Sequence, residues 1–148
     1  CEIGAIFAGA SAERRAALAE YGSKLGTAFQ VIDDLLDYQG DAGSTGKQTG
    51  NDFIEGKLTL PLLRALARAE APARAGIAAL FAGDRRERSS LDTVRRFIEQ
   101  HGGFDSARQA AVQLATEAVA ALAPFAGQDG ESLAMLHALT GYVLARNK

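Results

Sequence analysis

The stretch FQVIDDLLDY, residues 29–38, places three aspartates inside a strongly apolar run. Taking a carboxylate out of water costs free energy unless a cation or hydrogen-bond donors meet it. Each residue of a helix turns by about 100°, so Asp33, Asp34 and Asp37 share one arc, which also holds Gln30. The opposite arc, which we expect to face a core, holds the apolar residues Phe29, Val31, Ile32, Leu35 and Leu36.

A solvated acidic face is the simplest interpretation of such an arc, but two details argue against it. Asp33 and Asp37 are like charges at positions i and i+4, which destabilise a helix unless a cation intervenes. Aspartate also has a poor helix propensity. Clustered aspartate oxygens suit Mg²⁺, which commonly binds through one or two carboxylates together with substrate phosphates. The pattern therefore favours a magnesium site at Asp33, Asp34 and Asp37.

The rest of the chain is rich in alanine, leucine, arginine and glutamate, and it has no alternating strand pattern. These features predict an all-α fold, an antiparallel helical bundle in which the Ser11–Tyr38 helix is central. Plausible N-caps are Ser11, Ser89 or Ser90, and Asp129, and Pro72 suits a first helical turn. Further helices are expected at 1–9, 58–70, 72–82, 89–101, 103–123 and 129–146.

One long irregular segment is predicted from Gln39 to Lys57, and segments of that size are usually functional or disordered. Its glycines and small polar residues surround Lys47, and Lys57 is its last residue. Ammonium groups placed there could reach diphosphate oxygens, with plain solvated lysines as the alternative. The GSTGKQ stretch is not a P-loop, because Asp41 and Gln48 replace residues that the motif requires.

Length and composition narrow the class of protein. The 148 residues, 47% of them hydrophobic, suffice for one core, and a net charge of −2 gives no reason to expect nucleic acid as a partner. No apolar run predicts a transmembrane segment. A single cysteine, Cys1, rules out an internal disulfide framework and favours a reducing, cytoplasmic location. Because the chain starts in mid-pattern without Met, we expect a piece of a longer protein.

Two quoted stretches carry a family resemblance. GTAFQVIDDLLDYQGD (26–41) followed by TGKQTGNDFIEGKLTLPLL (45–63) resembles the second aspartate-rich region of the trans-isoprenyl diphosphate synthases. RRFIEQHGGFDSARQAAVQLATEAVAAL (95–122) and LTGYVLARNK (139–148) are similar to the carboxyl end of the long-chain, octaprenyl-like members. The resemblance implies the isoprenoid synthase fold and the carboxyl-terminal portion of a single polyprenyl synthase domain.

The resemblance also implies a reaction and roles for residues. Mg²⁺ would help an allylic diphosphate to ionise, and isopentenyl diphosphate would attack the allylic cation to lengthen a polyprenyl diphosphate. Asp33 would bind the metal directly, while Asp34 and Asp37 would act through water or as hydrogen-bonding partners. The diphosphate would be held by Gln30, Lys47 and Lys57, with Phe29 lining the site.

Other expectations follow from what the sequence does not contain. The family's first aspartate-rich motif is missing from residues 1–148. We therefore expect this portion to be inactive alone and to cover exposed apolar surface by forming a homo-oligomer. A class I terpene cyclase-like enzyme and a non-catalytic helical partner subunit remain alternatives, and the product length stays open.

Three further side chains are placed from the sequence in general terms. His101 and His137 are expected at the surface or at helix ends, and Met135 in the core. Tyr21 and Tyr142 receive no role.

Overall fold

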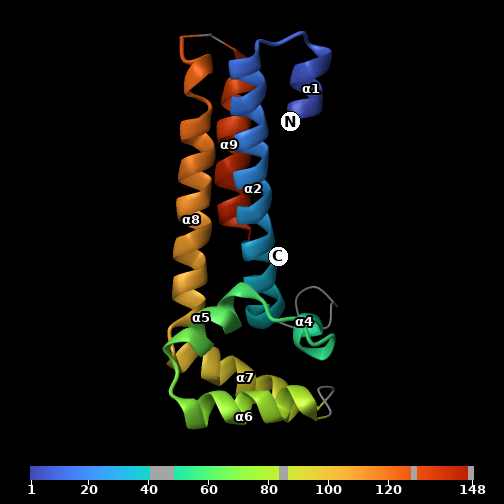
Figure 1. Cartoon of the computed structure of the whole chain (residues 1–148), viewed down its shortest axis with the longest axis vertical. Helices are drawn as coiled ribbons and strands as arrows, with labels where there is room; N and C mark the ends of the chain where they lie inside the picture. The colour runs from blue at the N-terminus through green and yellow to red at the C-terminus, as the bar shows by residue number, and fades with distance from the viewer. Residues whose placement is uncertain (41–48, 84–86, 128–129, 147–148) are drawn as a thin grey trace. The chain divides into compact units, whose positions relative to one another are not determined.

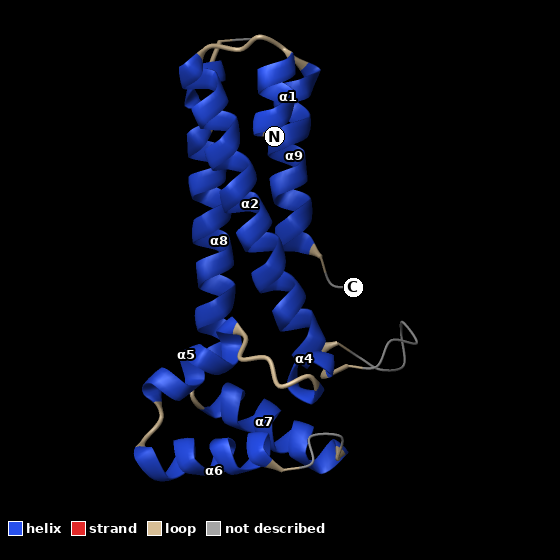
Figure 2. Ribbon diagram, turned by 45° about the vertical axis from the view of Figure 1, so that its right-hand side comes forward, coloured by secondary structure: helices blue, strands red, loops and turns tan. Residues whose placement is uncertain are grey.

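The computed structural model describes residues 1–40, 49–83, 87–127 and 130–146, and helices dominate these segments (Figures 1 and 2). Within them there is no strand, which confirms the all-α prediction. No helix in this described part is long and apolar enough to cross a membrane. In chain order the elements are α1 (Glu2–Phe7), α2 (Ala12–Gln39), α4 (Asn51–Ile54), α5 (Leu60–Arg68), α6 (Ala71–Ala82), α7 (Arg88–Gln100), α8 (Gly103–Ala121), the 3₁₀ helix η1 (Ala123–Phe125) and α9 (Glu131–Ala145).

The chain divides into two compact units. The first combines Cys1–Ile32 with Ala110–Arg146, and the second comprises Asp33–Gln109. Both α2 and α8 begin in one unit and end in the other. The first unit is therefore built from two segments that are far apart in sequence.

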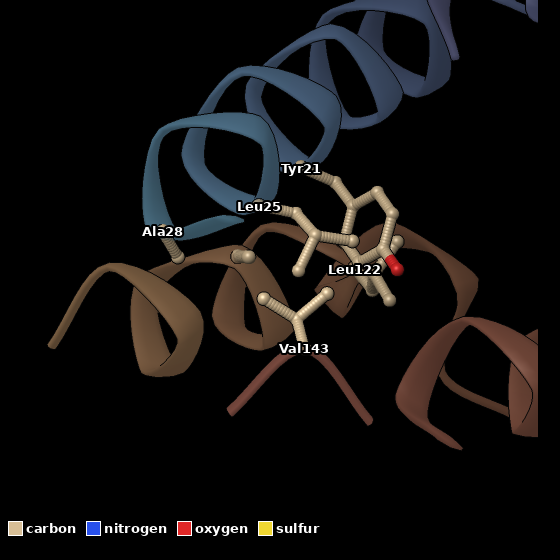
Figure 3. Packing of buried hydrophobic residues seen from close by; sticks show 6 residues of the cluster. Tyr21, Leu25, Ala28, Leu122 and Val143 are labelled. Carbon is tan, nitrogen blue, oxygen red and sulfur yellow. The ribbon is translucent and has the colours of Figure 1, made fainter. Parts of the chain in front are cut away.

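The core of the first unit forms where α2, α8 and α9 meet (Figure 3). Helix α2 contributes residues spaced by four and three positions, which keeps them on one face. Within this unit α8 runs antiparallel to α2 and α9 (Figures 1 and 2). The cluster consists of Tyr21, Leu25, Ala28, Ala118, Leu122 and Val143, none more than 8% exposed.

The second unit has its own core, in which helices α5 and α7 pack together and aromatic rings meet. The rings of Phe53 and Phe81 lie edge to face, with centroids 5.1 Å apart. The ring of Tyr38 tilts against Phe104 at 6.4 Å. A close approach is made by Gly103, where an added Cβ would lie 2.3 Å from the carbonyl oxygen of Pro61. Only a residue without a side chain fits there.

The predicted helix starts have different outcomes. Ser11 caps α2 as expected, because the Arg14 amide donates to its hydroxyl oxygen at 3.4 Å. Pro72 lies in the first turn of α6, also as expected. The N-cap of α7 is Glu87, so the assignment of Ser89 or Ser90 was wrong. The predicted cap Asp129 lies outside the described residues.

Two other expectations were wrong. Part of the supposedly irregular Gln39–Lys57 segment is helical, since α4 occupies Asn51–Ile54. Met135 was expected in the core but is 59% exposed. His101 follows the end of α7 and His137 is exposed, which confirms their expected surface and helix-end positions.

Candidate functional site

The aspartates of α2 lie on the polar side of the helix, as the helical periodicity of the sequence predicted. Asp33 is exposed, and Asp34 and Asp37 are half-buried. The apolar arc is buried at Val31, Ile32 and Leu35, with exposures of 6%, 2% and 1%. Burial of the apolar arc therefore fixes the rotation of α2 and with it the direction of the acids.

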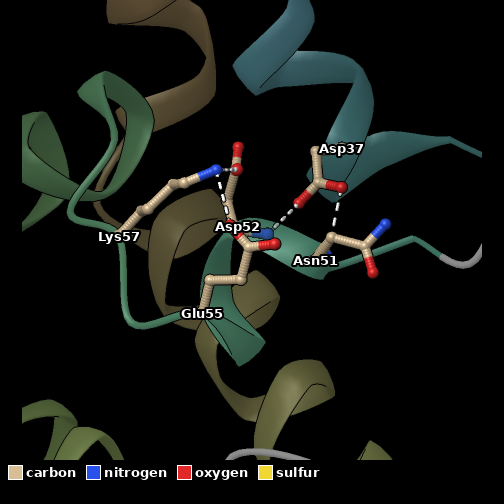
Figure 4. Close-up of polar contacts among 5 residues, drawn as sticks. All are labelled: Asp37, Asn51, Asp52, Glu55 and Lys57. Atoms are coloured by element: carbon tan, nitrogen blue, oxygen red, sulfur yellow. Dashed lines mark hydrogen bonds and ion pairs between the residues drawn. The ribbon is translucent and has the colours of Figure 1, made fainter.

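Asp37 caps α4 rather than facing water alone (Figure 4). Its two carboxylate oxygens accept hydrogen bonds from the backbone amides of Asn51 at 3.1 Å and Asp52 at 3.0 Å, the first residues of α4. Its own carbonyl accepts from the Gly50 amide at 2.8 Å. A carboxylate at a helix N-terminus satisfies amides that have no partner within the helix. Burial raises the pKa of Asp37, and these backbone hydrogen bonds oppose the shift.

Asp34 has a similar relation to the start of α5. Its carboxylate accepts a hydrogen bond from the backbone amide of Leu60, the first residue of that helix. Burial, together with the charges of Asp52, Asp33 and Asp37, raises the pKa of Asp34 to about 6, against the opposing hydrogen bond from Leu60. Three neighbouring carboxylates thus lie close enough to Asp34 to disfavour its charge, which is the condition that a bound cation relieves.

Asp52 also meets a cation from the same segment. The ammonium of Lys57 lies 3.1 Å from Asp52 Oδ1 and 2.7 Å from Glu55 Oε2 (Figure 4). These partners raise the pKa of Lys57, the Glu55 hydrogen bond most. The lysine side chain is 58% exposed, so the pairs are solvent-screened and a more highly charged anion could compete for the ammonium.

The other residues predicted to bind the substrate lie outside this cluster of carboxylates or outside the described residues. Gln30 is exposed on α2, in the part of the helix that belongs to the first unit. Phe29 was expected to face the core as well as to line the site, but it is 37% exposed, so its core assignment was wrong. The guanidinium carbon of Arg146 lies 4.3 Å from the centre of its ring. Lys47 lies outside the described residues.

The donor set fits Mg²⁺ held jointly with a phosphate ligand rather than a metal held by protein alone. Among the described residues no group of three or more His, Cys, Asp or Glu side chains converges as a metal cage. Mg²⁺ usually keeps several waters and binds one or two carboxylates plus substrate phosphates. The exposed carboxylate of Asp33 meets that requirement.

The sequence reasoning missed Asp52 and the contact between Arg146 and Phe29. A local signal for Asp52 existed, because Gly50–Asn51–Asp52 precedes the apolar Phe53, a pattern that favours a helix start. Gly50 indeed adopts a φ of 85°, and a side chain there would collide with Leu91. No local signal marks Arg146, because 116 residues separate it from Phe29 in the chain.

Comparison with known proteins places these features in a family. The polyprenyl synthetase family model matches residues 1–99. Octaprenyl diphosphate synthase of Haemophilus influenzae is 40% identical over 122 residues, which cover 82% of this chain and 36% of that protein.

Solved structures agree with that match. A decaprenyl diphosphate synthase from Rhodobacter capsulatus superposes with a TM-score of 0.86 at 38% identity, covering 99% of this chain and 45% of that one. A polyprenyl synthase from Caulobacter crescentus, complexed with calcium and isoprenyl diphosphate, gives 0.85 at 37% identity, covering 99% and 44%. The chain thus spans less than half the length of each of these relatives. With two-thirds of its length matched by the family model and its helices superposing on those of solved members, the chain belongs to the polyprenyl synthetase family.

Proposed function

We propose that this chain supplies the diphosphate-binding side of a prenyltransferase active site, which condenses isopentenyl diphosphate with an allylic diphosphate to lengthen a polyprenyl diphosphate. The observation that carries the proposal is the aspartate arc of α2, next to the Asp52–Lys57 pair, inside the region matched by the family model. A long-chain product is favoured by similarity to octaprenyl and decaprenyl diphosphate synthases.

Magnesium is the metal that we propose for this site. When bound, it supplies positive charge where a departing diphosphate accumulates negative charge. Asp33, which is exposed, would bind the metal directly. Asp34 and Asp37 keep the starts of α5 and α4 against α2 through their backbone hydrogen bonds, which leaves them to act through water.

The basic and polar residues would hold the substrate. Lys57 carries its charge at neutral pH, and on binding it would exchange its solvent-screened carboxylate partners for diphosphate oxygens. We propose the same task for Lys47 and Gln30. Phe29, partly exposed on α2, would line the site beside Gln30.

We also propose that the chain is a portion of one polyprenyl synthase domain and works in a homo-oligomer. The sequence contains one aspartate-rich motif, so a second set of acids would come from polypeptide outside these 148 residues. Large apolar side chains exposed in the first unit, Phe7 at 88% and Ile3 at 71%, support association. The single cysteine is in keeping with a cytoplasmic location. Sedimentation showing a stable monomer would contradict the association.

Calorimetric titration tests the proposed site directly. Farnesyl thiolodiphosphate, an allylic analogue that resists ionisation, should bind in the presence of Mg²⁺ and lose affinity when EDTA removes the metal. Asp33→Asn should weaken binding at least about tenfold, the loss of one charged ligand. The matched control is Asp105→Asn, an exposed aspartate in the first turn of α8 that should leave binding unchanged. Equal binding with and without Mg²⁺ would contradict the proposal.

Catalysis itself is measured by Mg²⁺-dependent incorporation of labelled isopentenyl diphosphate into longer products. We expect none from the 148 residues alone and activity when the second acid set is present. Turnover by the purified chain, in preparations shown free of longer forms, would refute the need for that second set.

A further inference from the structure

A cavity of about 440 Å³ lies between α6 and α7 in the second unit. Its volume is in the range of small-molecule binding sites. None of the aspartates or lysines of the candidate functional site lines it. The wall residues that carry the argument are Gly76, Ile77 and Leu80 on α6, and Arg96, Phe97 and His101 on or directly after α7.

The cavity has an apolar wall and a basic rim. Ile77 and Phe97 are buried, with exposures of 5% and 7%, while Arg96 is exposed at the surface. Of the described side chains that line this cavity, Arg96 alone carries a permanent charge, and none is acidic. A ligand that matches both parts has an apolar body and an anionic head group.

Gly76 lines the cavity, and nothing in its surroundings requires glycine there. It lies in the middle of α6, where glycine is less favourable than alanine by about 1 kcal/mol. It has no left-handed backbone conformation, and a Cβ placed on it would meet nothing within 4 Å. Apart from its cost to the helix, glycine at this position leaves the space that a side chain would occupy.

The polar end of the cavity is held in place before any ligand arrives. A carbonyl oxygen can only accept, so His101 Nδ1 donates the 2.9 Å hydrogen bond to the Phe97 carbonyl. The His101 ring also packs on the Phe97 ring, with centroids 4.4 Å apart. Arg68 donates to the carbonyls of His101 at 3.3 Å and Gly102 at 2.7 Å. Fixed side chains reduce the entropy lost on binding.

We propose that this cavity binds one molecule of a single-chain amphipathic anion, such as an alkyl phosphate. Its chain lies against Ile77, Leu80 and Phe97, and its head group meets the Arg96 guanidinium beside the His101 ring. This assignment does not rest on the prenyltransferase proposal, because the two sets of residues are separate.

The two histidines of the sequence provide a selective readout by NMR. Titration with octyl phosphate should shift the imidazole signals of His101 and leave those of His137, exposed on α9 in the first unit, unmoved. Octanol and inorganic phosphate, which each lack one half of the ligand, should bind at least about tenfold more weakly. Equal shifts at both histidines, or equal binding by either half-ligand, would overturn the proposal.

Three variants test whether binding depends on the cavity residues rather than on neighbouring surface charge. Gly76→Leu should abolish the His101 shift by filling the space, and Arg96→Gln should weaken octyl phosphate about tenfold. Arg74→Gln removes the same charge from an exposed position on α6 outside the cavity and should bind normally. An unchanged His101 response in Gly76→Leu protein whose amide NMR spectrum shows a folded second unit would overturn the proposal, as would an equal loss in Arg74→Gln.

Discussion

Three aspartates within five residues have different surroundings, although the sequence gives them one pattern. Asp37 accepts two backbone hydrogen bonds from α4, and Asp34 accepts one from α5. Asp33 is the exposed member of the three. The helical wheel could place all of them on one side of α2, but it could not divide them, because the amides that Asp34 and Asp37 meet lie beyond the Gly-rich segment.

Substitution should reveal this division. Asp37→Ala should lower the free energy of unfolding by about 1–2 kcal/mol, because it removes the acceptor for two amides at the start of α4. Asp33→Ala should change it by less than about 0.5 kcal/mol, as expected for an exposed side chain. Urea unfolding in magnesium-free buffer measures both values. Equal destabilisation by the two variants would contradict the assignment of different roles.

Lys24 and Glu117 form an ion pair in which the ammonium and the carboxylate lie 2.5 Å apart. The Lys24 hydrogen bond lowers the pKa of Glu117 below its usual value of 4.5, with help from Gln113. A lowered carboxylate pKa adds stability at pH values above the unfolded pKa, and this stability is lost as the pH falls through the folded pKa.

Carbon NMR of the Glu117 carboxyl group should therefore give a pKa below 4.5, and Lys24→Met should return it toward that value. Lys24→Arg, which retains the charge, should keep it low. A Glu117 pKa that does not respond to Lys24→Met would show that the pair does not persist in solution.

Strongly patterned helices are the part of this fold that sequence reasoning predicts well. The α2 helix was expected at Ser11–Tyr38 and is found at Ala12–Gln39, because a capping serine and a continuous apolar arc define it locally. The four-residue helix α4 was missed. The residues before Phe53 carry a weak local signal for its start, but the cap from Asp37 and the packing of Phe53 on Phe81 come from distant parts of the chain.

Glycines of similar appearance in the sequence also differ once elements pack. Gly103→Ala should lower the free energy of unfolding by about 2–3 kcal/mol, since its Cβ would lie 2.3 Å from the Pro61 carbonyl and 2.8 Å from an Ile98 methyl group. Gly76→Ala, the matched change in an open helical position, should raise it by about 0.5–1 kcal/mol. Thermal unfolding compares them, and destabilisation by both variants would contradict the packing described for Gly103.

For the molecule as a whole, the arrangement of the chain in the first unit is the feature that local patterns predict least. Residues 1–32 and 110–146 form one unit although 77 residues separate them. Sequence reasoning gave no role to Tyr21, yet it is fully buried and joins the two segments. Its hydroxyl donates a 2.8 Å hydrogen bond to the Leu136 carbonyl, 115 residues away. A distant backbone partner leaves no trace near Tyr21 in the sequence.

Removing that hydroxyl tests whether the two segments fold as one unit. Tyr21→Phe keeps the ring in the core and deletes the donor of this hydrogen bond. Apart from hydrogen bonds within the backbone of α9, the Leu136 carbonyl then keeps the 3.1 Å bond from the Thr140 hydroxyl. We expect the free energy of unfolding to fall by about 1–2 kcal/mol. Tyr142→Phe, the same change at a residue that is 66% exposed, should leave it within about 0.5 kcal/mol. Amide exchange should then show faster opening in both α2 and α9 of Tyr21→Phe, because the bond joins them. Faster exchange confined to α9 would mean that the two segments open independently.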